Sequence, residues 1–244
     1  MKRVLVVGGA NGIGLSIAKL LAEKDGVEQV HILDKAPLAE EYRAEKIESR
    51  VFDLTSEDYS VLDQYRDIDG LIITAGFGRL ALFEDIPEGM IEPYFQVNTI
   101  GVLRVIKHFY GKLLSQDDFY CGVMVSIAGF MSSPFFSVYG ATKAALKIFI
   151  ESVNVELEKS GSSNRILNVS PGSIKGTSFN QGGVNDLDLT RSLAADIVEN
   201  MEKKNDLFIP QYEEVFKEVL ERYHADFREE GKHSYEYKKK SGRV

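Results

Sequence analysis

Tyr139 and Lys143 are the two residues whose types and spacing best suit acid-base chemistry. They stand four positions apart in a stretch with a helical pattern, so both side chains fall on one helix face, one turn apart. A free tyrosine has a pKa of about 10, and a neighbouring ammonium group lowers that pKa by favouring the phenolate. The pair is a candidate acid-base couple for an alcohol or a ketone. The alternative is a half-buried ring beside a solvated amine, and the surrounding elements must decide between the two.

A glycine-rich turn lies near the start of the chain, between a predicted strand over residues 4–7 and a predicted helix that ends near residue 23. Such a turn lets the backbone approach a pyrophosphate closely and points helix N-terminal amides at it. The residues expected to bind a dinucleotide here are Gly8, Asn11, Gly12, Ile13 and Gly14. Glycines are also common in ordinary tight turns, and the position directly after the first strand is what favours the nucleotide site.

Asp34 ends the next predicted strand, 29–33, and comes twenty residues after Gly14. Dinucleotide-binding units place a carboxylate here to accept hydrogen bonds from the adenosine ribose. A carboxylate repels a 2′-phosphate, so this position favours NAD over NADP, although Lys35 beside it would soften the discrimination. The alternative is a turn-forming aspartate at a strand end.

Asp53 follows a third predicted strand, 47–52, and allows two interpretations. Residues 55–58 have the pattern of a capping box, which predicts a helix that ends near residue 65. Asp53 could be part of the cap of this helix. It could equally accept a hydrogen bond from an adenine amino group, with Leu54 packed on the ring. A fourth buried strand, 69–76, ends in Ala75 and Gly76, where a ligand can lie against bare backbone.

The rest of the chain continues the alternation of helices and strands. The further predicted elements are a long helix at 87–114, a strand at 122–126, a helix at 137–158, a strand at 165–169, a helix at 194–201, a short strand at 207–209 and an amphipathic helix at 212–227. Asn98 and Gly101 are poor helix formers inside the long helix, and an interior Asn can free a backbone carbonyl to bind water. The pattern predicts an α/β fold with a Rossmann-type, doubly wound parallel sheet.

The composition favours one domain that handles small molecules. The chain has 244 residues, 44% of them hydrophobic, enough for one large core. We expect a dinucleotide-binding catalytic part over 1–210 and, within the same domain, a helix and a solvated basic tail over 211–244. A net charge of -8 argues against a nucleic-acid partner. The short apolar run at the N-terminus predicts neither a signal peptide nor a membrane span, hence a cytoplasmic protein, and the scattered histidines with the single Cys121 predict no metal site.

Taken together, these motifs resemble the short-chain dehydrogenase/reductase family over about residues 1–180. The matching residues are Gly8, Gly12 and Gly14 of the glycine motif, Asp53 after the third strand, Ala75 and Gly76 after the fourth, and the tetrad Asn98, Ser126, Tyr139 and Lys143. The resemblance implies that Tyr139 is the general acid-base, and that Lys143 lowers its pKa and binds the nicotinamide ribose. It also implies that Ser126 holds the substrate oxygen and that Asn98 supports a water. Pro171, Gly172 and Ile174 would contact the nicotinamide.

The sequence departs from the family pattern at several positions. Val7 and Thr74 replace a hydroxyl residue and an asparagine, so hydrogen bonds around the glycine turn must differ. Gly176 occupies the place of a threonine that here follows as Thr177, which puts the contact of this loop with the cofactor in doubt. The C-terminal quarter lacks the strand that builds tetramers in many members.

The sequence therefore predicts an oxidoreductase that transfers a hydride between a nicotinamide cofactor, NAD in preference to NADP, and a secondary alcohol or ketone. An NADP-dependent carbonyl reductase is the close alternative, and a dinucleotide-sensing regulatory protein without turnover is the alternative from another class. The resemblance implies a homodimer built on the helices at 87–114 and 137–158, with a tetramer left open.

Overall fold

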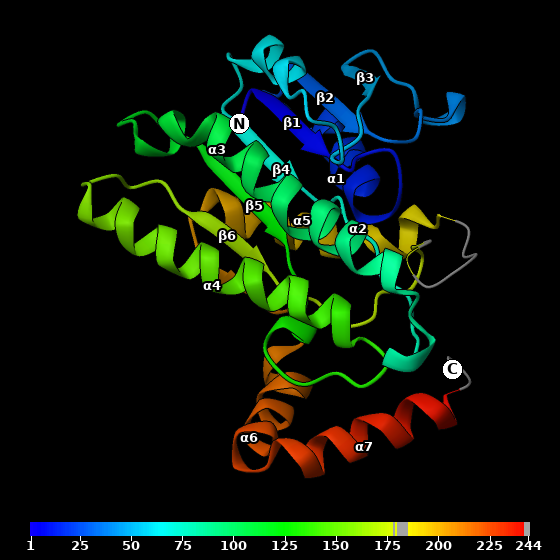
Figure 1. The fold of residues 1–244 in the computed structure, drawn as a ribbon. Coiled ribbons are helices and arrows are strands. Elements are labelled where there is room, and N and C mark those ends of the chain that lie inside the picture. The colour runs from blue at the N-terminus through cyan, green and yellow to red at the C-terminus, as the bar shows by residue number, and fades with distance from the viewer. Residues whose placement is uncertain (178, 180–184, 242–244) are drawn as a thin grey trace.

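The computed structural model describes residues 1–177, 179 and 185–241. Within them, seven parallel strands form one sheet in the order β3-β2-β1-β4-β5-β6-β7 (Figure 1). The strands are β1 (Arg3–Val7), β2 (Gln29–Asp34), β3 (Ile47–Val51), β4 (Gly70–Ile73), β5 (Tyr120–Met124), β6 (Ile166–Val169) and β7 (Leu207–Phe208). This sheet confirms the predicted doubly wound fold, with β1 at the point where the strand order reverses.

Helices cover both faces of the sheet (Figure 1). α1 (Gly12–Glu23) and α5 (Leu187–Glu202) pack on one face, and α3 (Val102–Leu114) and α4 (Ser137–Lys159) pack on the other. Successive side chains of a strand point to opposite faces. In β1, Val4 and Val6 therefore join the core under α1 and α5, whereas Leu5 and Val7 join the core under α3 and α4. Burial on both faces explains why the central strands β1 and β4 are nearly continuous apolar runs, whereas the edge strand β3 is polar and exposed.

The helix predicted over 87–114 is interrupted in the way that Asn98 suggested. α2 (Ile91–Phe95) passes into a π-helical segment, Gln96–Gly101, before α3 begins at Val102. π-Helical turns inside α-helices are rare and are frequent at functional sites. Gly101 is required here, because a Cβ on it would lie 2.8 Å from the Cβ of Leu54. The irregular turn thus packs tightly against the residue that follows Asp53.

The helix predicted after the capping box at 55–58 does not form. The chain makes only a 3₁₀ helix, Ser60–Tyr65. Asp53 Oδ1 accepts from the amide of Thr55, and Ser56 Oγ accepts from the amide of Asp58. These side chains satisfy local amides two residues further on, which offers the backbone an alternative to a helical turn.

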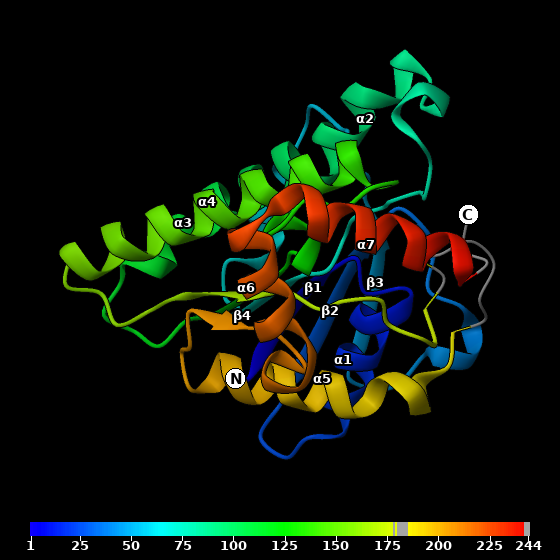
Figure 2. The same cartoon turned by 90° about the horizontal axis from the view of Figure 1, so that it is seen from below.

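The C-terminal region also differs from the prediction. A π-helical segment, Tyr212–Phe216, continues into α6 (Lys217–Ala225), and a separate helix, α7 (Phe227–Lys240), follows it. Asp226 ends α6 and caps α7 by accepting from the amides of Arg228 and Glu229. The basic tail is therefore helical as far as Lys240, and Lys239 and Lys240 are exposed to solvent as predicted. Figure 2 shows α7 lying across the carboxyl ends of the strands.

None of the described helices is both long and apolar enough to pass through a bilayer.

Candidate active site

A cavity of about 860 Å³ lies where the strands end. Every residue that the sequence assigned to the cofactor lines it: Gly8, Asn11, Gly12, Ile13, Gly14, Asp34, Asp53, Leu54, Ala75, Gly76, Tyr139, Lys143, Pro171, Gly172 and Ile174. Ser126 also lines the cavity, whereas Asn98 does not. The tertiary structure thus brings the predicted nucleotide-binding and acid-base residues to one site, as expected at the carboxyl ends of parallel strands.

Gly8 and Gly14 shape the turn at the end of β1. Gly8 has φ +90, and a Cβ on it would lie 2.3 Å from the amide nitrogen of Ala75. A Cβ on Gly14 would lie 2.3 Å from the carbonyl oxygen of Gly8 and from Oγ1 of Thr74. The Thr74 hydroxyl donates to that Gly8 oxygen at 2.9 Å, which is one hydrogen bond that the departure from the family asparagine creates. Bare backbone consequently faces the cavity, which is what a pyrophosphate requires.

Asp34 is held by two backbone amides. Its Oδ2 accepts from Ala10 at 3.0 Å, and its Oδ1 accepts from Ala36 at 3.0 Å. Each carboxylate oxygen has a further lone pair, so the side chain can still accept from ribose hydroxyls. Lys35 also lines the cavity and brings a positive charge close to the same position.

Both interpretations of Asp53 fit its surroundings. Its Oδ1 accepts from the amide and the hydroxyl of Thr55 at 2.8 and 2.9 Å, which is the turn-forming role. The side chain is exposed and lines the cavity, so Oδ2 is available to an adenine amino group. Leu54 is 6% exposed and lies beside it in the cavity wall.

Tyr139 lies in the first turns of α4 with its ring buried. Burial raises the pKa of Tyr139 to about 12, and the neighbouring Ser126 hydroxyl opposes this rise. Ser126 Oγ also accepts from the amide of Ala128 at 3.1 Å, which fixes the hydroxyl at the end of the strand. The phenol and the serine hydroxyl are therefore placed to bind one substrate oxygen together.

Lys143 is one turn further along α4 and is 2% exposed. Its Nζ donates to the carbonyl oxygen of Met124 at 2.9 Å and lies 5.7 Å from the centre of the Tyr139 ring. Burial lowers the pKa of Lys143 to about 7. We expected the lysine charge to lower the pKa of Tyr139, but burial penalises the charged form of both groups and dominates both pKa values.

Asn98 acts on the backbone rather than on the cavity. It is fully buried, its Oδ1 accepts from the amide of Phe77 at 2.9 Å, and its Nδ2 donates to the carbonyl of Phe77 at 2.8 Å. Its Nδ2 also lies 3.2 Å from Oγ1 of Thr142 on α4. Asn98 thus connects the chain that follows β4 to α4. Gly76 lies beside this connection, and a Cβ on it would lie 3.3 Å from both Asn98 Oδ1 and Lys143 Nζ.

The loop after β6 meets the C-terminal region. A Cβ on Gly172 would lie 2.6 Å from the ring of Phe216, so glycine is required where the aromatic ring packs on the loop. Gly176 has φ +77, which explains why glycine occupies the usual threonine place. The displaced Thr177 still lines the cavity, and its hydroxyl donates to the carbonyl oxygen of Ile174 at 3.2 Å.

Asn185 is a residue of this site that the sequence did not reveal. Its Oδ1 accepts from the amide of Gly12 at 2.9 Å, and its Nδ2 donates to Oδ1 of Asn11 at 3.0 Å. The Gly12 amide opens α1, where a phosphate oxygen would be the natural acceptor. A dinucleotide that uses this amide must therefore replace the Asn185 oxygen.

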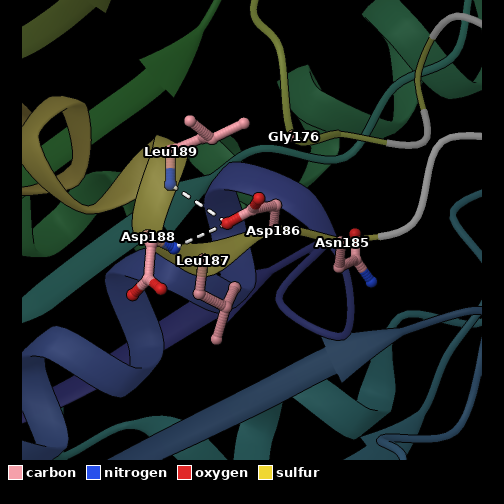
Figure 3. A pocket seen from close by; sticks show the side chains of 6 residues that line it. All are labelled: Gly176, Asn185, Asp186, Leu187, Asp188 and Leu189. Atoms are coloured by element: carbon pink, nitrogen blue, oxygen red, sulfur yellow. Dashed lines mark hydrogen bonds between the residues drawn. The ribbon is translucent and has the colours of Figure 1, made fainter.

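A second, more open depression lies at the start of α5 (Figure 3). Asp186 caps the helix there by accepting from the amides of Asp188 and Leu189 at 3.1 and 3.3 Å. The side chains of Asp186 and Asp188 give this surface negative charge. Because like charges repel, it suits a phosphate group far less than the glycine turn does.

The C-terminal helices supply a wall of the cavity that the sequence analysis missed. The lining residues from this region are Pro210, Gln211, Val215, Phe216, Val219, Arg222, Glu230, His233, Ser234, Tyr237 and Lys238. Asp226 and Glu229 form the pattern of a helix N-terminus and could have revealed α7. The face of α7 toward the cavity is polar, so hydrophobic periodicity could not mark it.

Comparison with known proteins identifies the family. A sequence model of the short chain dehydrogenase family matches residues 2–187, so the protein belongs to this family of oxidoreductases. An uncharacterized oxidoreductase of Staphylococcus saprophyticus subsp. saprophyticus is 28% identical over 188 residues, which cover 71% of this chain and 78% of that protein. A short-chain dehydrogenase from Streptomyces avermitilis shares the fold with a TM-score of 0.76 at 21% identity, over 97% of this chain and 100% of that one. A short-chain dehydrogenase from Sphingobium yanoikuyae, solved in complex with NADPH, has a TM-score of 0.71 at 21% identity, over 93% of this chain and 96% of that one.

The lowered pKa of Lys143 predicts a pH-dependent stability. Between about pH 7 and the unfolded-state lysine pKa of about 10.4, the unfolded chain binds a proton that folded Lys143 has released, so stability rises with pH. Lys143→Met removes this group. We compare the free energy of unfolding of Lys143→Met with that of wild type. The variant's value minus the wild-type value should fall as pH rises from about 7 to 9.5, by at most about 1.4 kcal/mol per pH unit.

Urea denaturation at several pH values measures this difference. Lys159→Met, at an exposed position of the same helix, is the matched control and should keep a constant difference from wild type. A difference for Lys143→Met that is also constant with pH would contradict the effect of burial.

Proposed function

We propose that the protein transfers a hydride between a nicotinamide dinucleotide and a secondary alcohol or ketone. The observation that carries the proposal is the convergence of Tyr139, Ser126 and Lys143 in the cavity that also contains the glycine turn and Asp34. The residues fit a dinucleotide, because the close packing of Gly8 on Ala75 leaves backbone facing the phosphate position and Asp34 ends the neighbouring strand.

In this proposal the protein handles the proton while the nicotinamide, when bound, supplies or accepts the hydride. Ser126 hydrogen-bonds the substrate oxygen and orients it toward Tyr139. With a pKa of about 12, Tyr139 carries its proton near neutral pH, which is the form that donates to a carbonyl oxygen during reduction. Oxidation requires the phenolate, and a charged Lys143 favours that form.

Replacing Tyr139 with Phe tests the acid-base role. The ring and its packing remain, but the proton donor is lost, so kcat for a ketone should fall roughly 100- to 10,000-fold while dinucleotide affinity changes little. Steady-state kinetics and calorimetric titration of the dinucleotide measure the two quantities. Tyr110→Phe on α3, outside the cavity lining, is the control.

Unchanged turnover in Tyr139→Phe would contradict the acid-base assignment. Tight dinucleotide binding by wild type without turnover of any alcohol or ketone would favour the alternative, a dinucleotide-sensing regulatory protein of the same fold.

We also propose that NAD is preferred over NADP. The support is the position of Asp34, whose carboxylate would lie next to a 2′-phosphate and repel it. Lys35 weakens this repulsion, and the relative from Sphingobium yanoikuyae was solved with NADPH, so an NADP-dependent carbonyl reductase is the specific alternative.

Asp34→Asn separates these cofactor assignments. The charge disappears, and the Asn side chain keeps one acceptor for a backbone amide but loses the other, a change that affects both dinucleotides alike. The ratio of NADP to NAD affinity should therefore rise at least about tenfold, the effect of removing roughly 1.4 kcal/mol of repulsion. Calorimetric titration with NAD, NADH, NADP and NADPH measures the ratio. Asp25→Asn, at an exposed position after α1, is the control. Tighter binding of NADP than NAD by wild type would overturn the preference.

We propose a homodimer built on the faces of α3 and α4. Large apolar side chains are exposed on these helices: Leu114 (41%), Ile148 (59%) and Val155 (58%). Ile148 and Val155 are seven residues apart and share one face of α4. Burial against a second copy would remove this apolar surface from water.

Charging this face tests the dimer. In the double variant Ile148→Lys with Val155→Lys, two buried lysines per subunit would lack partners. The mass measured by sedimentation velocity should therefore fall from that of two chains to that of one chain. Leu189→Lys, which alters an equally exposed residue (59%) on α5, should leave the mass unchanged. A wild-type protein that sediments as one chain would contradict the proposal.

A further inference from the structure

Glu230 is a buried carboxylate in the wall of the cavity, and the acid-base chemistry of Tyr139 makes no use of it. Its residue is 6% exposed and comes from α7, outside the residues that the family model matches. A charged side chain at this depth is unfavourable unless it is paired and hydrogen-bonded. The geometry around its two oxygens shows how far this requirement is met.

One oxygen of Glu230 is paired and the other is open. Arg222 Nε donates to Oε2 at 2.7 Å, so this oxygen has a cationic partner and α6 is joined to α7. Oε1 lies 3.7 Å from Nδ1 of His233, which is beyond hydrogen-bond distance. Within the part of the chain that the structure describes, no donor forms a hydrogen bond to Oε1.

The position of Glu230 is fixed relative to the acid-base residues. On α7, Tyr235 stacks on Phe135 with ring centres 4.7 Å apart, and Lys238 Nζ donates to Ser133 Oγ and to the carbonyl of Pro134 at 2.7 Å each. These loop residues directly precede α4, which carries Tyr139. Phe135 has φ 68, a left-handed conformation that is unfavourable for a residue with a Cβ and that persists only where its surroundings hold it.

The cavity as a whole is lined mainly by apolar groups, although the face of α7 that carries Glu230 is polar. The rings of Phe136 and Phe179 lie 5.1 and 5.4 Å from the ring of Tyr139, and Phe216 and Val219 line the same cavity from the C-terminal side. A ligand in contact with these walls has an apolar body. Glu230 is thus a hydrogen-bond acceptor on the polar side of a largely apolar cavity, where such a group contributes strongly to specificity.

We infer that Glu230 determines substrate specificity by accepting, through Oε1, a hydrogen bond from a second hydroxyl group of the substrate, remote from the reacting carbon. This inference rests on the proposed alcohol and ketone chemistry. Arg222 pairs with Glu230 at 2.7 Å and also with the exposed Glu218 at 3.3 Å. Because the carboxylate of Glu230 already has a cationic partner, a neutral hydroxyl fits Oε1, and a substrate carboxylate would be repelled. The substrate class is a secondary alcohol or ketone with an apolar body and a remote hydroxyl.

Matched ligand pairs test the assignment. The probes are ω-hydroxy-2-alkanones of graded chain length, each compared with the 2-alkanone that carries a methyl group in place of the hydroxyl. Calorimetric titration of the full-length protein, with dinucleotide present, should give about tenfold to a hundredfold tighter binding of the hydroxyl member at the chain length that reaches Glu230. In Glu230→Gln the amide oxygen still accepts from Arg222, but the amide nitrogen replaces Oε1 and offers the hydroxyl only a neutral donor in place of a charged acceptor, so this preference should weaken.

Two further variants separate recognition from folding. Glu229→Gln changes an exposed neighbour on α7 and should retain the preference. Glu230→Asp keeps the charge but withdraws it by one methylene, and it should reduce the preference even if Glu230→Gln does not fold. A purely structural Glu230 would change the melting temperature in these variants without changing the ratio of affinities.

The inference is overturned by equal affinities within every pair, by a preference that is undiminished in Glu230→Gln, or by tighter binding of the matching ω-amino ketones. Turnover of the plain 2-alkanones is a separate readout. Its absence would contradict the proposed function, while the binding ratios would still decide the role of Glu230.

Discussion

The contact between the glycine turn and the end of β4 is the constraint on which the site depends. Gly8 and Gly14 pack so closely on Ala75 and Thr74 that a single added carbon would lie 2.3 Å from backbone or hydroxyl atoms. This contact sets where α1 begins, and therefore where its N-terminal amides face the cavity. It also leaves Asp34, at the end of the adjacent strand, within reach of the turn through the amide of Ala10. A nucleotide-binding surface follows from how tightly backbone can pack.

Burial then decides the electrostatics of the acid-base pair. Tyr139 and Lys143 lie on one helix face, but the cavity wall excludes water from both, so each group favours its neutral form. The pKa of the lysine falls to about 7, within the range where it titrates near neutral pH, while the phenol keeps its proton. Asn98 contributes indirectly, since it fixes the backbone of Phe77 and the irregular helical turn beside α4. The reactivity of the pair thus depends on packing as much as on its spacing.

The C-terminal helices make the site particular to this protein. α7 crosses the carboxyl ends of the strands and joins the loop before α4 through the stack of Tyr235 on Phe135 and the hydrogen bonds of Lys238 (Figure 2). Phe216 packs on Gly172 in the loop after β6. The family match ends at residue 187, so the C-terminal wall of the cavity comes from outside the shared sequence.

The sequence by itself determined the fold class, and it named the residues proposed for nucleotide binding and acid-base chemistry, because strand periodicity and short spacings such as Tyr139 to Lys143 are local properties. The helix predicted after the capping box at 55–58 was wrong. There the side chains of Asp53 and Ser56 bind nearby backbone amides instead of opening a helix. Only the tertiary structure decided that α7 returns over the cavity and that Asn185 meets the amide of Gly12, a contact between residues far apart in the chain. It also decided the pKa shifts of Tyr139 and Lys143, because desolvation depends on what surrounds a group in space and not on its neighbours in sequence.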